Sequence, residues 1–88
     1  MAMNRFELPP GNGWVEVVTT TTETNVIVEN LTSVPVKMSL QGSQPSAGTN
    51  VYHTLNPNEK FHRETLNTSI WVRDNDDKAT AVVIVSNE

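Results

Sequence analysis

From residue 14 onwards, short apolar runs alternate with polar turn segments at intervals of about 8–12 residues. The clearest run is 34–41, where every second residue is apolar; because Pro35 cannot donate to a ladder, this strand is an edge or begins near Pro35. Further strands are predicted at 14–20, 25–30, 50–55, 60–66, 70–73 and 79–85. No window repeats apolar residues at helical spacing. The pattern predicts an all-β fold, a single small antiparallel β-sandwich or jelly-roll-like domain of about seven strands.

The last stretch, 69–86, predicts a strand, a polar turn and a second strand. Its first arm alternates isoleucine and valine with Trp71 and Arg73, and its second arm is almost continuously apolar. An alternating strand has one covered face, whereas a continuously apolar strand is usually covered on both. We therefore predict a hairpin that holds the middle of a sheet, with Ile70, Val72 and residues 82–85 in the core.

The first 13 residues predict an extended N-terminal arm, which leaves 14–88 as the β-sandwich domain. Pro9 and Pro10 favour polyproline II geometry, and the Gly-Asn-Gly that follows makes a flexible break. Before this break, four apolar residues have nothing local to bury them: Met1, Met3, Phe6 and Leu8. The arm is either a disordered terminus or a segment that packs on a neighbouring subunit.

Composition limits the classes of function. The 88 residues make one domain with 36% hydrophobic residues, which is a thin core that oligomerisation often supports. There is no cysteine, so disulfides and thiol chemistry are excluded. The net charge is −4 and the six basic residues are scattered, which disfavours nucleic acid as a partner. We also expect no signal peptide, no membrane partner and synthesis in the cytoplasm.

Candidate chemistry is sparse. His53 and His62 flank the predicted turn 56–59 and could meet in space, with Glu59 or Glu64 as a third ligand, but tight metal-ligand spacing is missing. The acidic run 74–78 lacks the ligand pattern of a calcium loop and predicts a plain turn. No strained nucleophile elbow or phosphate-binding loop occurs. We therefore expect no catalytic residues, no metal and no cofactor, and a protein that is not an enzyme.

Two tryptophans and an arginine are candidates for contact with a partner. Trp71 and Arg73 share the face opposite Ile70 and Val72, and Trp14 opens the first strand after the arm. Tryptophan and arginine are enriched at the energetic centres of interfaces. The alternatives are a second core face beneath Trp71, or an aromatic anchor for a partner or a sugar.

The layout V-E-N-L-T-S-V-P-V-K-M-S-L, a Gly/Ser/Pro loop, L-N-P-N-E-K-F and a valine-rich end resembles small structural proteins of tailed-phage virions. These include capsid decoration (cement) proteins and short fibre modules. The resemblance covers 26–86, and Asn58 stands where their L-x-P-G-E-type turn usually has glycine. It implies a small β-sandwich or jelly roll that sits on the capsid surface of the virion, often as a homotrimer, and contacts the major capsid protein.

The first functional hypothesis is therefore a structural virion protein that decorates and cements a phage capsid by bridging neighbouring capsid subunits. Its expected partner-contact residues are Met3, Phe6, Leu8, Trp14, Trp71 and Arg73. The alternative is a carbohydrate- or receptor-binding β-sandwich module of a phage fibre, which predicts exposed aromatic side chains in a shallow groove, with Trp71, Tyr52 and Trp14 as candidates.

Overall fold

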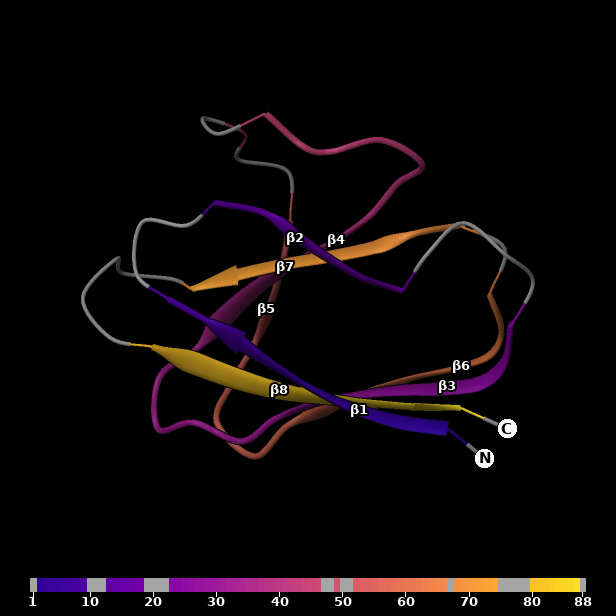
Figure 1. Ribbon diagram of the computed structural model, residues 1–88, viewed down its shortest axis with the longest axis horizontal. Coiled ribbons are helices and arrows are strands. Elements are labelled where there is room, and N and C mark those ends of the chain that lie inside the picture. Colours follow the sequence, from indigo (N-terminus) through magenta and orange to yellow (C-terminus); the bar gives the residue numbers. More distant parts are fainter. Residues whose placement is uncertain are drawn as a thin grey trace.

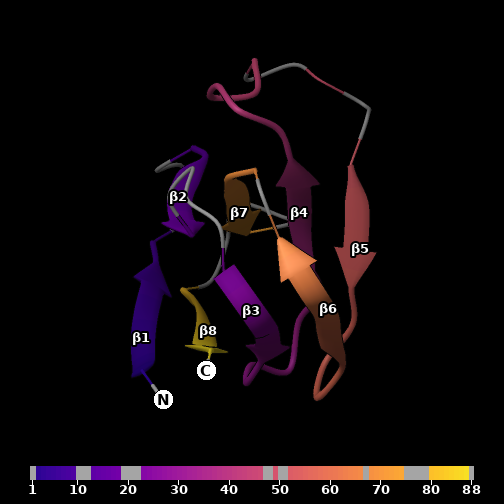
Figure 2. The ribbon, with the colours of Figure 1, turned by 90° about the vertical axis from the view of Figure 1, so that its right-hand side faces the viewer.

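The computed structural model describes residues 2–9, 13–18, 23–46, 49, 52–66, 68–74 and 80–87. These residues form the strands β1 (Ala2–Leu8), β2 (Val15–Val18), β3 (Glu23–Asn30), β4 (Val36–Leu40), β5 (His53–Leu55), β6 (Lys60–Leu66), β7 (Ile70–Asp74) and β8 (Ala81–Asn87). Sheet A has the order β1-β8-β3-β6 and sheet B the order β2-β7-β4-β5, packed as two layers (Figure 1 and Figure 2). This part of the chain contains no helix, and so none long and apolar enough to cross a membrane.

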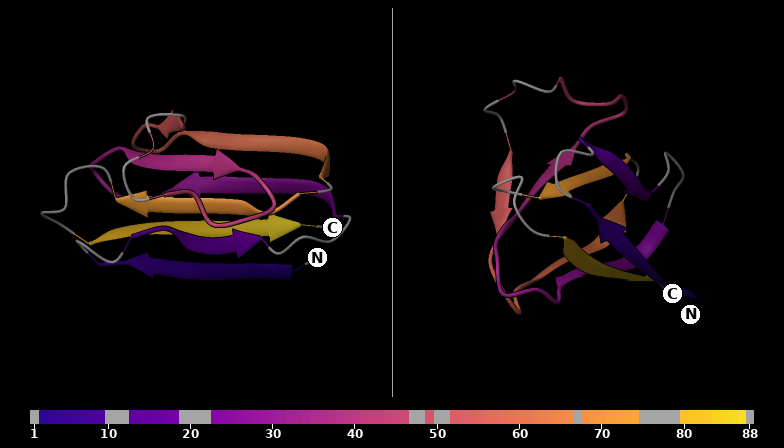
Figure 3. Two further views of the ribbon diagram at one scale, coloured as in Figure 1. Left: turned by 90° about the horizontal axis from the view of Figure 1, so that it is seen from above. Right: turned by 60° about the vertical axis from the view of Figure 1, so that its left-hand side comes forward.

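The order of pairing is that of a jelly roll. β1 pairs with β8, β2 with β7, β3 with β6 and β4 with β5, all antiparallel, so the chain is one long hairpin wound around the core. Pairings of β3 with β8 and β4 with β7 complete the sheets, whose strands lie nearly along one direction (Figure 3). The predicted antiparallel sandwich is confirmed. The described residues contain eight strands where about seven were expected, and the additional strand is β1.

The two arms of the predicted hairpin 69–86 lie in different sheets, so the predicted hairpin is wrong. β7 is central in sheet B and β8 is central in sheet A. In this fold the chain passes from one sheet to the other between them, and the apolar pattern of a central strand is the same whichever sheet holds it. The predicted core positions are correct for Ile70, Val72, Val83 and Val85, which are buried, and wrong for Val82 and Ile84, which are half-buried on the outer face of sheet A. Residues 75–79 of the predicted turn lie outside the described residues.

The predicted arm over 1–13 is, for residues 2–8, a strand of the sandwich itself. β1 runs antiparallel to β8 from Ala2 opposite Asn87 to Leu8 opposite Ala81. Leu8 is only 1% exposed and Phe6 packs against the core. The arm prediction is therefore wrong for these residues: the apolar side chains that lack a local partner are covered by the opposite end of the chain. Residues 1 and 10–12 lie outside the described residues.

The core lies between the sheets and follows the period of two along each strand. β4 begins at Val36, directly after Pro35, as the missing backbone donor of proline requires. Fully buried side chains come from central strands of both sheets, and burying a valine or isoleucine side chain stabilises the fold by about 1.5–3 kcal/mol. The core side chains are Leu8, Val17, Val18, Val26, Val28, Val36, Met38, Leu55, Ile70, Val72, Ala81, Val83 and Val85.

A buried asparagine fixes the corner where β3 leaves sheet A for sheet B. The Asn30 side chain donates from Nδ2 to the carbonyl oxygens of Val34 at 2.8 Å and Leu55 at 3.0 Å. Its Oδ1 accepts from the backbone N–H of Thr32 at 2.9 Å and from the Thr32 hydroxyl at 2.6 Å. One fully buried side chain thus ties the β3–β4 connection to the end of β5.

Candidate functional site

The outer face of sheet A has a row of side chains centred on Ile84 of β8. Arg5 of β1 and Glu29 of β3 are both in register with Ile84, and Lys60 of β6 is in register with Glu29. Since Ala81, Val83 and Val85 of β8 point into the core, the intervening Val82 and Ile84 point outward. The row therefore presents an apolar centre between a cation and an anion.

Apolar side chains continue on both sides of this row. Met3 of β1 and Ile27 of β3 share a row with Ser86, and Val82 lies beside Leu31, whose N–H donates to the Val82 carbonyl at 3.0 Å. Met3 is 64% exposed and Leu31 is 43% exposed, the two large hydrophobic residues that stand out at the surface of the described chain. We call this surface the Ile84 face; it consists of Met3, Arg5, Ile27, Glu29, Leu31, Val82 and Ile84.

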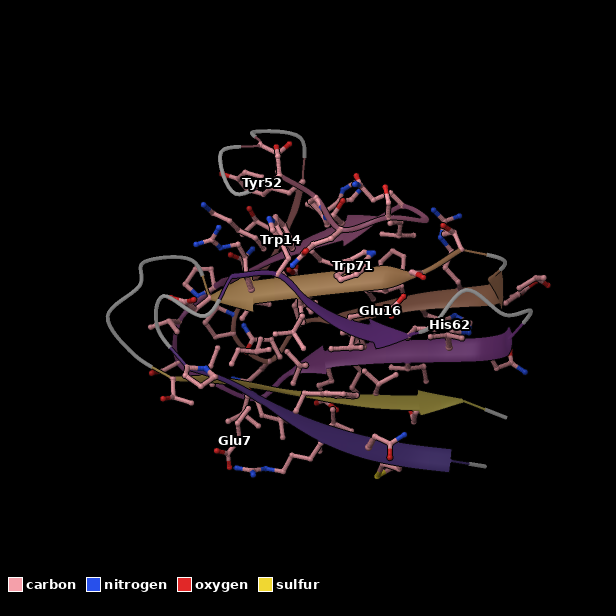
Figure 4. All side chains as sticks on the ribbon, turned by 45° about the horizontal axis from the view of Figure 1, so that its top comes forward. Glu7, Trp14, Glu16, Tyr52, His62 and Trp71 are labelled. Carbon is pink, nitrogen blue, oxygen red and sulfur yellow. The ribbon has the colours of Figure 1, made fainter. Side chains whose placement is uncertain are left out.

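A charged rim lies beside the Ile84 face on β1. The Arg5 guanidinium donates to Glu7 Oε1 at 2.6 Å, and both side chains are more than half exposed. Figure 4 shows Glu7 projecting away from the sandwich on the side of β1 and β8. A partly exposed apolar patch bordered by charges has the make-up of a protein contact surface rather than of a pocket for chemistry.

The outer face of sheet B is different, because a loop lies against it. Trp71 is half-buried, and its indole N–H donates to the carbonyl of Gln41 at 3.0 Å. Gln44 Nε2 donates to the carbonyl of Trp14 at 3.1 Å, and Pro45 is buried. The segment 41–46 therefore covers part of this face, and the alternative of a second core beneath Trp71 describes it better than a bare aromatic platform.

Cations stack on the aromatic rings of sheet B. The Arg73 guanidinium carbon lies 5.9 Å from the ring centre of Trp14, and Lys37 Nζ lies 4.8 Å from that of Tyr52. Lys37 and Arg73 are themselves opposite each other in the β4–β7 register. Figure 4 shows Trp14, Tyr52 and Trp71 on the side of the sandwich away from β1 and β8. The aromatic residues thus gather on one side, held by contacts within the chain.

The six predicted partner-contact residues do not come together. Leu8 and Trp14 are 1% and 5% exposed, so their assignment to a partner is wrong: each is buried within the chain. Phe6 is half-buried against the core. Met3 lies on the Ile84 face of sheet A, whereas Trp71 and Arg73 lie half-buried on the opposite side, in sheet B.

Sequence reasoning missed most of the Ile84 face. Residues 81–85 of β8 are all apolar, and this pattern does not separate a face covered by the chain itself from one left open. Ile27 lies in the predicted strand 25–30, for which no outward face was predicted, and Leu31 lies outside the predicted strands. The signal that could have found them is the outward register of β3 and β8, which only the topology supplies.

The histidines lie in different sheets. His53 is on β5 and His62 on β6, and both are exposed. Among the residues that the structure describes, no group of three or more His, Cys, Asp or Glu side chains could hold a metal ion.

The turn between β5 and β6 has Pro57 at its second position and Asn58 at φ 63°, with Glu59 N donating to the Asn56 carbonyl at 3.0 Å. These are the features of a type II turn, with asparagine in place of glycine.

Two other polar features have structural explanations. Asn30 matches a glycosylation acceptor pattern, but its side-chain amide is buried and bonded, so the folded chain cannot present it to an enzyme. Ser69 is buried, and its hydroxyl donates to Glu16 Oε2 at 2.6 Å, which joins the start of β7 to β2.

No protein-family model, curated protein or solved structure matches the chain.

Proposed function

We propose that this chain is a structural virion protein that decorates and stabilises a phage capsid by bridging neighbouring capsid subunits, acting as a homo-oligomer. The observation that carries the proposal is the Ile84 face. Its apolar centre, Val82 and Ile84, is half-buried, the flanking Met3 and Leu31 are exposed, and its rim is charged, which is the make-up of a contact surface. The chemistry of this face suits association with protein.

The architecture supports the same proposal. The double-sheet jelly roll is a frequent fold of viral capsid and lectin domains, and the sequence resemblance to phage decoration proteins spans 26–86. Fold by itself does not decide function. The Ile84 face supplies the contact surface that such a role needs, and Trp71 and Arg73 on sheet B are the further contact candidates.

The experiment mixes the purified chain with capsids of the virus that encodes it, prepared without the chain. We expect saturable binding with a fixed number of copies per capsid subunit, and capsids that withstand a higher temperature before they release their DNA. The variant Ile84→Lys should bind more weakly, whereas Ser46→Lys, which adds the same charge at an exposed loop residue, should bind as the wild type does. Wild-type protein that does not bind these capsids above background would refute the proposal.

A carbohydrate- or receptor-binding module of a phage fibre is the second candidate. The observation that favours it is the pair of half-exposed rings Tyr52 and Trp71, beside the cations Lys37 and Arg73, on sheet B. A glycan array with the wild type and Trp71→Phe tests this candidate. It predicts a glycan signal that the variant weakens, and a blank array at about 1 mM protein would argue against it.

A further inference from the structure

We propose that the Ile84 face binds a second copy of this chain across a two-fold axis that lies along β8. The inference rests on the proposed function to the extent that it assigns the occupant of the same face. Its basis is the arrangement of charge: the register of β1 and β3 against β8 places opposite charges so that the face is complementary to a copy of itself.

Two sheets that pack face to face lie about 10 Å apart with their strands roughly aligned. When the two-fold axis runs along β8 in the plane of the contact, each strand on one side of β8 meets its counterpart from the other side, within the same row. β8 then meets β8 of the second copy, and β1 meets β3. This operation determines every opposing pair without further assumptions.

The pairs that result are complementary. In the central row, Ile84 meets Ile84 of the second copy, and Arg5 meets Glu29 of the second copy. In the next row, Met3 meets Ile27 of the second copy, so the most exposed apolar side chain is covered by another apolar one. Because the contact is two-fold, each of these unlike pairs is made twice.

The remaining row is less well matched and lies at the corner of the patch. It brings Glu7 toward Leu31 of the second copy, while Val82 meets Val82. Glu7 accepts from Arg5 within its own chain, so its charge is already paired at this corner. The contact is therefore centred on Ile84 and Met3.

Association through the face is favoured over association through an edge of sheet A. β6 forms one edge and carries exposed Lys60, His62, Arg63 and Glu64, and charged edges of this kind oppose the addition of another strand. The outer face of sheet A has an apolar centre and charges of opposite sign on opposite sides of β8. A second copy supplies the complementary arrangement by symmetry.

The experiment uses two charge-reversal variants, Arg5→Glu and Glu29→Arg, and measures the mass of the full chain by sedimentation and native mass spectrometry. Each variant alone places like charges together twice in its own dimer, and we expect a dissociation constant at least about tenfold higher than that of the wild type. Mixed in equal amounts, the two variants restore both unlike pairs. We therefore expect the mixture to form the heterodimer with affinity near the wild-type value.

Rescue by mixing separates this proposal from an effect on the fold of one chain, because a change inside one copy cannot be corrected by another copy. The matched controls are Arg63→Glu and Glu64→Arg on β6, which make the same charge changes outside the Ile84 face and should leave association unchanged. A second route tests the apolar centre: Met3→Lys changes a side chain that is 64% exposed, so it should weaken the dimer while the chain stays folded.

Three results would overturn the inference: a wild-type monomer at about 1 mM, a trimer, or variants whose mixture associates no better than each alone. Any of these can occur with capsid binding intact, in which case the decoration role stands and the second copy is not the partner of the Ile84 face; a monomer would also refute the homo-oligomer of the proposed function. Conversely, a dimer that is restored by mixing but does not bind capsids would support the two-fold contact and refute the decoration role.

Discussion

Arg5 and Glu29 lie on opposite sides of Ile84, each in register with it, on the two strands that flank β8. The apolar side chain of Ile84 thus separates the cation from the anion within one chain. Each has another charged neighbour there: Arg5 donates to Glu7, and Glu29 is in register with Lys60. This antisymmetric placement about β8 is what makes the Ile84 face complementary to itself. It links an ordinary jelly-roll register to a specific mode of assembly.

Replacing Asn30 by alanine should destabilise the fold more than any surface change. The substitution removes two donated and two accepted hydrogen bonds, so the Leu55 carbonyl loses the amide that donates to it, whereas the Val34 carbonyl still accepts from the Thr32 hydroxyl. We expect a loss of about 2–4 kcal/mol in the free energy of unfolding, measured by urea denaturation. Asn4→Ala, on an exposed residue of β1, is the control and should change it by less than about 0.5 kcal/mol. Equal effects of the two substitutions would contradict the role of the corner.

The same methionine-to-alanine substitution at buried Met38 and at exposed Met3 tests how much the core contributes to stability. Met38 is 2% exposed between the sheets, so Met38→Ala leaves a cavity and should lower the free energy of unfolding by about 2–5 kcal/mol. Met3 is 64% exposed, and Met3→Ala should change the stability of the monomer by about 0.5 kcal/mol or less. Thermal and urea unfolding at low protein concentration measure both; a large effect of Met3→Ala there would mean that β1 is packed differently.

The turn at Asn58 tests the backbone conformation directly. Its φ of 63° lies in the left-handed region, which costs a branched side chain about 1–2 kcal/mol. We expect Asn58→Val to destabilise the fold by about that amount and Asn58→Gly to leave it within about 1 kcal/mol of the wild type. If valine is tolerated as well as glycine in an unfolding experiment, the turn does not have the type II form.

Much of the fold can be predicted from sequence because burial leaves a period of two. The alternation at 34–41 identifies β4 and its start after Pro35, and Ile70 and Val72 are core residues as predicted. The partner of each strand cannot be predicted in this way, since pairing in a jelly roll joins residues far apart in the chain. β1 was therefore interpreted as an arm, although its partner is β8 at the other end.

The candidate site is harder to predict than the fold. Met3 was predicted as a partner contact from its lack of local burial; it is exposed in the structure, and its contact with a partner stays a prediction. Val82 and Ile84 were predicted as core residues and Ile27 was not assigned to a face, because a continuous apolar strand suggests that both faces are covered and does not identify which segment covers them. The charges that give the face its specificity are informative only after β1, β8 and β3 are placed side by side.

Trp71 tests the contact between the loop and sheet B. Trp71→Phe removes the hydrogen bond to the Gln41 carbonyl and should lower the free energy of unfolding by about 0.5–1.5 kcal/mol. Because segment 41–46 lies against this tryptophan, the same variant should speed amide hydrogen exchange in the segment. Exchange rates identical to those of the wild type would show that the loop is held by other contacts.

The oxidation rate of Met3 tests the central claim, that the Ile84 face is an assembly surface, most directly. Dilute peroxide converts exposed methionine to its sulfoxide, and buried Met38 is an internal control in the same chain. Peptide mass spectrometry would compare the wild type with Arg5→Glu at about 1 µM and about 1 mM protein. At the higher concentration, we predict that Met3 of the wild type oxidises about threefold more slowly than Met3 of the variant, with Met38 slow throughout. Equal Met3 rates in the two proteins at both concentrations would contradict the account.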